Sequence, residues 1–156
     1  MAAARISTCL WFDSDAEAAA LLYCSLFADA RITSVFRQSG DPQNRVFLIE
    51  FSLNGQNFAA MNGGPMYRLS PATLIVVQLG TQDEVDRIWP ALVADSGQQS
   101  RGGWLTDRYG LSWQIIPRAL PRLLQADASG RVLQAMMALM AMVKIDIAAL
   151  ELAFKG

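Results

Sequence analysis

The sequence predicts a single α+β domain, residues 1–156, built from two related strand–helix–strand–strand–strand (βαβββ) modules and a helical end. Two capping boxes, Ser14-Asp-Ala-Glu17 and Thr81-Gln-Asp-Glu84, open predicted helices 67 residues apart. Two hairpin turns, Asn54-Gly55 and Tyr109-Gly110, lie 55 residues apart. A plan repeated at this scale indicates duplication of one module. The expected boundaries are 5–65 for module one, 72–117 for module two and 118–156 for the helical segment.

Module one begins with a predicted strand over residues 5–12, followed by a helix over 14–27. The apolar residues Ala18, Leu21, Leu22 and Leu26 recur at helical spacing and predict the buried stripe of this helix. β-branched and aromatic residues, together with the Asn-Gly turn, then predict three strands. These strands are expected at residues 30–38, 45–53 and 56–62.

Module two repeats this order with a shorter middle. An apolar strand over 72–79 precedes a helix that reaches about residue 95, with a buried stripe of Val85, Ile88, Trp89 and Leu92. Pro90 lies inside this helix and is expected to kink or shorten it, because proline lacks a backbone donor. The three remaining strands are expected at residues 98–101, 104–107 and 111–117.

The segment after Pro117 is predicted to be helical, over residues 120–126, 129–143 and 147–154, with Asp146 as the N-cap of the last helix. The middle helix is rich in methionine, which predicts core or dimer contacts. A methionine-rich helix is also typical of adaptable binding surfaces, so a protein-interaction module is one alternative function.

Composition excludes several classes of function. Hydrophobic residues make up 53% of the chain and the net charge is −1, which disfavours nucleic-acid and membrane partners. The sequence contains no histidine, which rules out Ser-His-Asp and Cys-His catalysis and histidine-bound metals. Cys9 and Cys24 are predicted to be buried, reduced and inert thiols of a cytoplasmic protein rather than a disulfide.

Several short segments lie in order along nearly the whole chain: Cys9-Leu-Trp-Phe-Asp13, Ser25-Leu-Phe27, Leu53-Asn-Gly-Gln56, Met61-Asn-Gly-Gly-Pro65, Glu84-Val-Asp86 with Trp89, Gly103-Trp-Leu-Thr-Asp107-Arg108-Tyr-Gly-Leu-Ser-Trp-Gln114 and Lys144-Ile-Asp-Ile-Ala-Ala-Leu150. Together they resemble the PhnB-like group of the vicinal oxygen chelate superfamily. This group is labelled 3-demethylubiquinone-9 3-methyltransferase, and the superfamily includes glyoxalase I, bleomycin-resistance proteins and extradiol dioxygenases. The resemblance implies cupped mixed sheets with a small-molecule cleft, and a bacterial-type homodimer.

Metal-dependent members of this superfamily use ligands on the first and last strands of each module. The resemblance, together with the two repeat spacings, implies that the corresponding positions in this sequence are Ser7, Ala59, Leu74 and Gln114. Alanine and leucine have no donor atom, and serine is a weak neutral ligand. We therefore expect no metal and no cofactor.

Alternation along the strands predicts which side chains share the cleft face with the four carried-over positions. The candidate ligand-binding residues are Ser7, Cys9, Trp11, Met61, Asn62, Val76, Gln78, Trp104, Ser112 and Gln114. The same residues could instead fill a core, and Asn62 could simply cap the turn after its strand. A metal-free protein that binds an unknown small molecule is the preferred function.

An enzyme is the second hypothesis, because Glu50 and Asp107 are carboxylates within or beside predicted strands. Glu50 falls on the third strand of its module and is expected to be exposed or salt-bridged. Asp107 is expected to stabilise the turn at Tyr109-Gly110. Methyl transfer from S-adenosylmethionine is disfavoured, because no G-x-G-x-x-G segment opens a helix after a strand.

Overall fold

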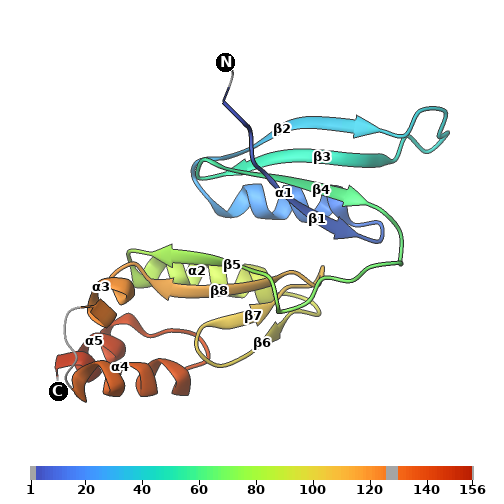
Figure 1. The fold of residues 1–156 in the computed structure, drawn as a ribbon. Helices are drawn as coiled ribbons and strands as arrows, with labels where there is room; N and C mark the ends of the chain where they lie inside the picture. Colours follow the sequence, from blue (N-terminus) through green and yellow to red (C-terminus); the bar gives the residue numbers. More distant parts are fainter. Residues whose placement is uncertain (1–2, 126–129, 156) are drawn as a thin grey trace. The chain divides into compact units, whose positions relative to one another are not determined.

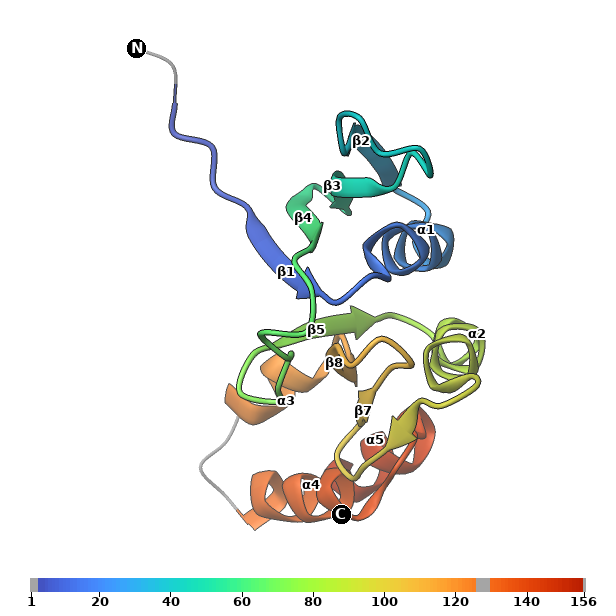
Figure 2. The same cartoon turned by 90° about the vertical axis from the view of Figure 1, so that its right-hand side faces the viewer.

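The computed structural model describes residues 3–125 and 130–155. The chain divides into two compact units, Met1–Leu69 and Ser70–Gly156. Each unit contains one four-stranded mixed sheet with a helix against one face (Figures 1 and 2). The predicted α+β fold of two βαβββ modules with C-terminal helices is confirmed.

The first unit follows the order strand, helix and three strands. Its sheet has the strand order β1-β4-β3-β2, in which β1 and β4 are parallel and the other neighbours are antiparallel. The elements are β1 (Thr8–Phe12), α1 (Ala16–Leu26), β2 (Ala30–Arg37), β3 (Val46–Leu53) and β4 (Gln56–Asn62).

The second unit repeats this plan with the strand order β5-β8-β7-β6. Its elements are β5 (Leu74–Leu79), α2 (Gln82–Val93), β6 (Gln98–Gln99), β7 (Trp104–Thr106) and β8 (Ser112–Pro117). The strands β6 and β7 are much shorter than their counterparts β2 and β3, which is the shorter middle expected from the sequence.

Strand pairing carries the same two repeat spacings as the sequence. In the first sheet Cys9 lies beside Ala59, and in the second sheet Val76 lies beside Gln114. Adding 67 to a β1 residue and 55 to its β4 partner gives a pair that is in register between β5 and β8. The duplication is therefore present residue by residue in the hydrogen-bonded register.

The core of the first unit lies between α1 and its sheet. The helix buries Ala19, Ala20 and Tyr23, while Leu21 is 55% exposed. The predicted stripe was therefore wrong for Ala18 and Leu21, which face solvent, and right for Leu26. The small alanines let the helix approach the sheet closely, and Tyr23 lies against Phe51 with ring centroids 6.3 Å apart.

The core of the second unit matches its prediction. Val85, Ile88, Trp89 and Leu92 are all buried on one side of α2. The helix continues through Pro90 and ends at Val93, so proline sits within its last turn rather than breaking it. The polar residues of α2 lie on the other side, which is why the sequence defined its buried side correctly.

The two predicted capping boxes have different outcomes. At α2, Thr81 Oγ1 accepts a hydrogen bond from the Glu84 backbone (3.2 Å), and Glu84 Oε2 accepts one from the Thr81 backbone (3.0 Å). At α1 the prediction was wrong, because Asp15 holds the N-cap position without a side-chain bond. Glu17 instead forms an ion pair with Arg37 (3.0 Å).

This difference predicts unequal effects of two matched substitutions. Thr81→Ala should destabilise the protein by about 1 kcal/mol, since it removes a formed helix cap. Ser14→Ala should change the free energy of unfolding by less than about 0.5 kcal/mol, the usual range for a surface site. Urea unfolding of both variants tests this, and equal losses would contradict the assignment of the caps.

The C-terminal segment forms three helices, α3 (Leu120–Gln125), α4 (Gly130–Ala141) and α5 (Ile147–Lys155). Two residues of the predicted helices, Ala126 and Ser129, lie outside the described residues. Asp146 Oδ1 accepts a hydrogen bond from the Ala149 backbone (2.9 Å), which confirms the predicted N-cap of α5. No helix in the described ranges is long and apolar enough to cross a membrane.

These helices belong to the second unit through a buried cluster and several polar contacts. The backbone N–H groups of Gly102 and Gly103 donate to the carbonyls of Met142 (2.7 Å) and Val143 (3.1 Å). Gln82 Oε1 accepts from the Ile147 backbone (2.9 Å) at the start of α5. The apolar side chains of the cluster are Ile116, Leu120, Ala135, Leu139, Ile145 and Leu150.

Candidate functional site

The face of the first sheet opposite α1 carries three of the predicted cleft residues. Alternation turns Leu10 of β1 toward the core and Cys9 and Trp11 the other way. Trp11 lies beside Met61 of β4 in the parallel register, so both side chains share this face. We call it the open face of the first sheet.

Trp11 is held in place by the segment that follows β4. Its indole N–H donates to the Gly64 carbonyl (2.9 Å), and its ring meets Tyr67 edge to face at 4.9 Å. A Cβ on Gly63 would lie 2.2 Å from Cζ2 of the indole, so only glycine fits there. The glycine pair that resembles a family motif thus has a packing role beside Trp11.

Ser7 precedes β1 and is exposed, so the pairing of β1 with β4 does not assign it to a face. Asn62 Oδ1 accepts a hydrogen bond from the Ala16 backbone (2.9 Å), and its Nδ2 donates to the Val46 carbonyl (2.9 Å). Asn62 therefore caps α1 from the neighbouring strand, rather than lining the open face or capping the turn after it.

The second sheet has a corresponding open face opposite α2, which is exposed at Val76 and Gln78 but covered at Ile116 by the buried cluster of the C-terminal helices. Val76 of β5 lies beside Gln114 of β8, and Gln78 lies beside Ile116. Trp104 of β7 is opposite Gln114 on the other side, so its indole belongs to the same face. The amide of Gln114 donates to the Gly102 carbonyl (3.2 Å). The register thus places the module-two candidates on one side of the second sheet.

A groove on this face brings Trp104 and Ser112 together. We call it the Trp104 groove, and its lining residues are Pro71, Gln98, Gln99, Ser100, Trp104, Leu105, Thr106 and Ser112. Thr106 Oγ1 lies 3.5 Å from Ser112 Oγ. Sequence reasoning missed Gln98, Ser100 and Thr106, because only the pairing of β6, β7 and β8 places them beside Ser112.

The two carboxylates of the enzyme hypothesis lie in different environments. Glu50 of β3 lies between Ser34 and Ala59 in the register, which places it on the open face of the first sheet. Glu50 is half-buried, and within the described part of the chain its carboxylate has no ion pair or hydrogen bond, so neither the expected exposure nor the expected salt bridge is found. It remains a candidate acid or base.

Asp107 has the predicted turn role. It is 3% exposed, and its carboxylate accepts hydrogen bonds from the backbones of Tyr109 (2.8 Å) and Leu111 (3.1 Å) and from the indole of Trp113 (2.9 Å). These bonds hold the hairpin between β7 and β8. A carboxylate committed to three structural donors is poorly suited to proton transfer.

The four superfamily ligand positions do not form a metal-binding set. Ala59 and Leu74 have no donor atoms, and the Gln114 amide already bonds to backbone. Divalent first-row metals take imidazole, thiolate or carboxylate ligands, usually at least three from the protein. Among the described residues, no three cysteine, aspartate or glutamate side chains come close enough to hold an ion.

Neither cysteine provides a reactive thiolate. Cys9 is exposed, contrary to the predicted burial, and Cys24 is half-buried in α1. Both are free thiols, and desolvation raises the pKa of each above its ordinary value. The thiols stay protonated near neutral pH, which agrees with their expected inertness.

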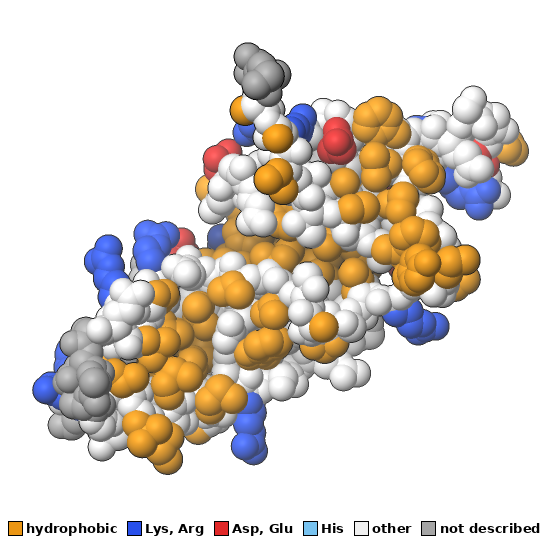
Figure 3. All heavy atoms as spheres, viewed as in Figure 1, with side chains coloured by type: hydrophobic (Ala, Val, Ile, Leu, Met, Phe, Trp, Pro, Cys, Tyr) orange, Lys and Arg blue, Asp and Glu red, His pale blue; other side chains and the backbone are white. Residues whose placement is uncertain are grey.

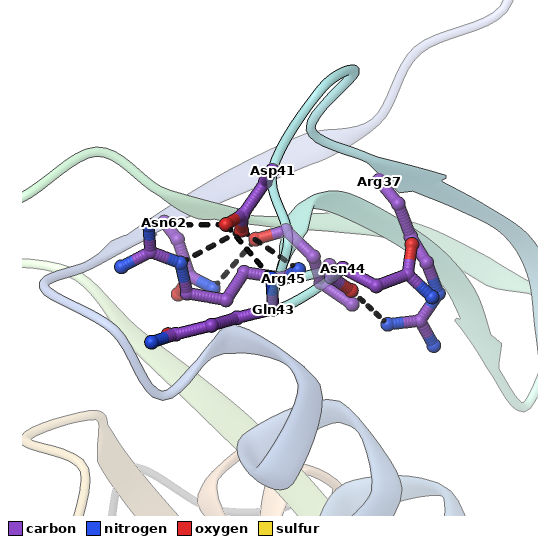
Figure 4. A network of polar contacts seen from close by, with 7 residues as sticks. Arg37, Asp41, Gln43, Asn44, Arg45 and Asn62 are labelled. Atoms are coloured by element: carbon purple, nitrogen blue, oxygen red, sulfur yellow. Dashed lines mark hydrogen bonds and ion pairs between the residues drawn. The ribbon is translucent and has the colours of Figure 1, made fainter.

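A second groove in the first unit lies between the start of α1 and the β2–β3 loop, and Figure 4 shows its polar network. Arg37 pairs with Glu17, and Arg45 Nε pairs with Asp41 (2.8 Å). The Arg45 guanidinium, with the backbones of Arg45 and Gln43, lowers the pKa of Asp41 to about 2. These contacts order the loop and leave both arginines neutralised, so the groove presents no free cation to a ligand.

Comparison with known proteins places the chain in a family. The model of the family described as 3-demethylubiquinone-9 3-methyltransferase matches residues 4–116. A search of the curated proteins found no significant match. Residues 117–156, with the three C-terminal helices, lie beyond the matched part of the chain.

Solved structures give the same fold. The PhnB protein from Bacillus cereus is 29% identical over 73% of this chain and 99% of its own, with a TM-score of 0.67. Protein PA1353 from Pseudomonas aeruginosa is 15% identical over 74% of this chain and 98% of its own, with a TM-score of 0.62.

The fosfomycin resistance protein FosX from Listeria monocytogenes, complexed with Mn(II) and sulfate, also has this fold. It is 14% identical over 81% of this chain and 98% of its own, with a TM-score of 0.54. The family match covers most of the chain and agrees with the repeated register of its sheets. The chain belongs to the 3-demethylubiquinone-9 3-methyltransferase family, the PhnB-like group of the vicinal oxygen chelate superfamily.

Proposed function

We propose that this protein binds a small molecule in the Trp104 groove, on the open face of its second sheet, without a metal ion. The observation that carries the proposal is the convergence of an indole, two hydroxyls and an amide from three adjacent strands on one groove. Pockets that recognise small molecules combine such an apolar surface with a few placed polar groups. The proposal includes a cytoplasmic homodimer, as the resemblance implies.

The absence of a suitable donor set supports binding that does not depend on a metal. FosX is described in complex with Mn(II), whereas this chain has alanine and leucine at two of the four carried-over positions. Methyl transfer, which the family description names, is not favoured either. After β4, the Gly64 carbonyl accepts the indole N–H of Trp11. Before β7, the backbones of Gly102 and Gly103 donate to the C-terminal segment. Neither glycine pair therefore forms a cofactor loop.

Thermal-shift screening of a fragment library tests the proposal. Hits on the purified protein should appear equally with EDTA and with added Mn²⁺ or Zn²⁺. Trp104→Ala should weaken binding of each hit by about tenfold or more, since an aromatic anchor in a groove dominates affinity. Met66→Ala is the matched control, because Met66 is 75% exposed and does not line the groove.

Stabilisation by a divalent metal alone would contradict the metal-free proposal. Hits that bind Trp104→Ala as tightly as the unaltered protein would contradict the assignment of the groove. Circular dichroism of both variants establishes that each is folded.

An enzyme that uses Glu50 is the second candidate, favoured by the place of this carboxylate on an open sheet face without a bonding partner among the described residues. Asp107 is not a candidate catalytic residue, because its carboxylate accepts three hydrogen bonds that hold its hairpin. Turnover of a bound ligand that Glu50→Gln abolishes while binding persists would establish the enzyme.

The alternative function, a protein-interaction module, is supported by exposed apolar residues on the outer side of α4. Leu133, Met137 and Met140 recur at helical spacing and are 64%, 65% and 52% exposed. Figure 3 shows hydrophobic side chains gathered over these C-terminal helices. The rest of α4 faces the buried cluster through Ala135 and Leu139, so the methionine-rich helix is partly core.

A further inference from the structure

We propose that the Trp104 groove takes a neutral, hydroxyl-rich ligand of the size of a monosaccharide. This inference rests on the proposed function, because it requires the groove to be a binding site. It adds the chemical class of the ligand, which follows from the charge, the hydrogen-bonding capacity and the spacing of the groups that line the groove.

The lining of the Trp104 groove is uncharged. None of the residues that line the groove is ionised at neutral pH. Arg101 follows Ser100 in sequence but is not a lining residue, and the Asp107 carboxylate is occupied by three bonds within its hairpin. An anionic or cationic ligand would give up hydration without meeting an opposite charge, which is strongly unfavourable.

The lining of the groove has unused hydrogen-bonding capacity. Among the described residues, the Gln98 amide, the Ser100 hydroxyl and the Trp104 indole N–H make no side-chain hydrogen bond. The groove therefore offers unused donors and acceptors that water satisfies. A purely apolar ligand would bury these groups without partners, at a cost of about 1–3 kcal/mol for each one.

Hydroxyl groups are the matching chemistry, because each one both donates and accepts. Side-chain amides and the hydroxyls of serine and threonine have the same double capacity. A polyol can satisfy such a lining in many relative orientations, whereas a ligand with only acceptors or only donors leaves part of it unpaired.

The polar side chains of the groove come from successive strands. Gln98 of β6 lies opposite Thr106 of β7, which lies opposite Ser112 of β8, so three neutral polar side chains form a row across adjacent strands. Neighbouring strands are about 4.8 Å apart. The row thus presents hydrogen-bonding groups at intervals comparable with the separation of hydroxyls across one sugar ring.

Trp104 lies in the adjacent row, two residues before Thr106 on the same strand and on the same face. A half-buried indole gives a flat apolar surface, and its N–H adds a donor at the edge. The ring carbons of a monosaccharide suit this surface, while its hydroxyls reach the polar row. The groove can therefore contact both the apolar ring carbons and the hydroxyls of a polyol.

Three sets of probes, measured by calorimetry and tryptophan fluorescence, test the inference. Glucose, galactose and myo-inositol are neutral polyols; glucuronate and glucose 6-phosphate carry charge on a similar ring; phenol and hydroquinone are flat aromatics. We expect at least one neutral polyol to bind at millimolar concentration or below, more tightly than its charged or aromatic counterparts.

Thr106→Val and Gln98→Leu should each weaken that binding by about tenfold, the effect of one lost hydrogen bond. Gln56→Leu is the matched control, because Gln56 is exposed at the start of β4 in the first unit and does not line the groove. Equal affinity in all three variants would overturn the inference.

The probe sets separate failure of the ligand class from failure of the site. Preferential binding of a charged or aromatic probe that Trp104→Ala abolishes would overturn the ligand class and leave the groove as the binding site. No binding by any probe would overturn the ligand class alone, whereas binding that Trp104→Ala leaves unchanged would overturn both the ligand class and the groove as the binding site.

Discussion

Replacing Asp107 with alanine should destabilise the protein by about 3–5 kcal/mol, because several buried donors would lose their acceptor at once. The carboxylate now accepts from two backbone N–H groups of its hairpin and from the indole of Trp113, which is fully buried. Urea unfolding followed by tryptophan fluorescence would measure the loss. Asp107→Asn should recover part of it, since the amide oxygen can still accept.

The matched control for Asp107 is Asp29→Ala. The Asp29 side chain is 72% exposed and pairs with Arg31 at the surface (3.5 Å), so its loss should cost less than about 1 kcal/mol. If Asp107→Ala kept full stability and lost only ligand turnover, Asp107 would be catalytic rather than structural.

Gly103→Ala should cost about 3 kcal/mol or more, since it combines overpacking with a left-handed backbone conformation. Gly103 has φ +73°, and a Cβ there would lie 2.3 Å from the Ile115 carbonyl oxygen and 3.0 Å from Ile145. The backbone would have to move, which would also disturb the bonds from Gly102 and Gly103 to the C-terminal segment.

Gly110→Ala separates the two contributions. Gly110 has φ +87°, but a Cβ added there would meet no atom within 4 Å, so only the conformational strain remains, about 1–2 kcal/mol. Thermal unfolding of both variants makes the comparison. Equal losses would show that crowding at Ile115 is unimportant.

The sequence predicted the fold because the repeated signals are local. Asn-Gly and Tyr-Gly turns and the Thr81 cap depend on residues a few positions apart, and they gave the spacings that the register confirms. The buried side of α2 was also predictable, since charged residues such as Asp86 and Arg87 mark its exposed side.

The side of α1 was not predictable in the same way. Ala18, Ala19 and Ala20 follow one another with no polar residue to mark the exposed side, so pattern alone favoured the larger leucines. Tertiary packing selected the alanines and Tyr23 instead. The hydrogen bond by which Asn62 caps α1 was also not predicted, because its partner Ala16 lies 46 residues away in sequence.

The candidate site was predictable to the level of strand faces. Alternation placed Ser112 on the face of Gln114, and Trp104 was expected at a strand end near the rim of the cleft. The pairing of β7 with β8 brings the two residues together. The Trp104 groove also needs β6, which was expected as part of a strand over 98–101 but whose register with β7 was not predicted. Gln98 and Thr106 are therefore identified as lining residues only from the register of the three strands.

The repeated register separates what the two copies of the module had to keep from what they were free to change. The helix-facing pairs Leu10 and Val77, and Ala60 and Ile115, are apolar in both copies. The corresponding open-face pairs, Trp11 with Gln78 and Ala59 with Gln114, differ in chemistry. Duplication has thus left one inherited frame with two divergent faces, each able to acquire its own chemistry without cost to the frame.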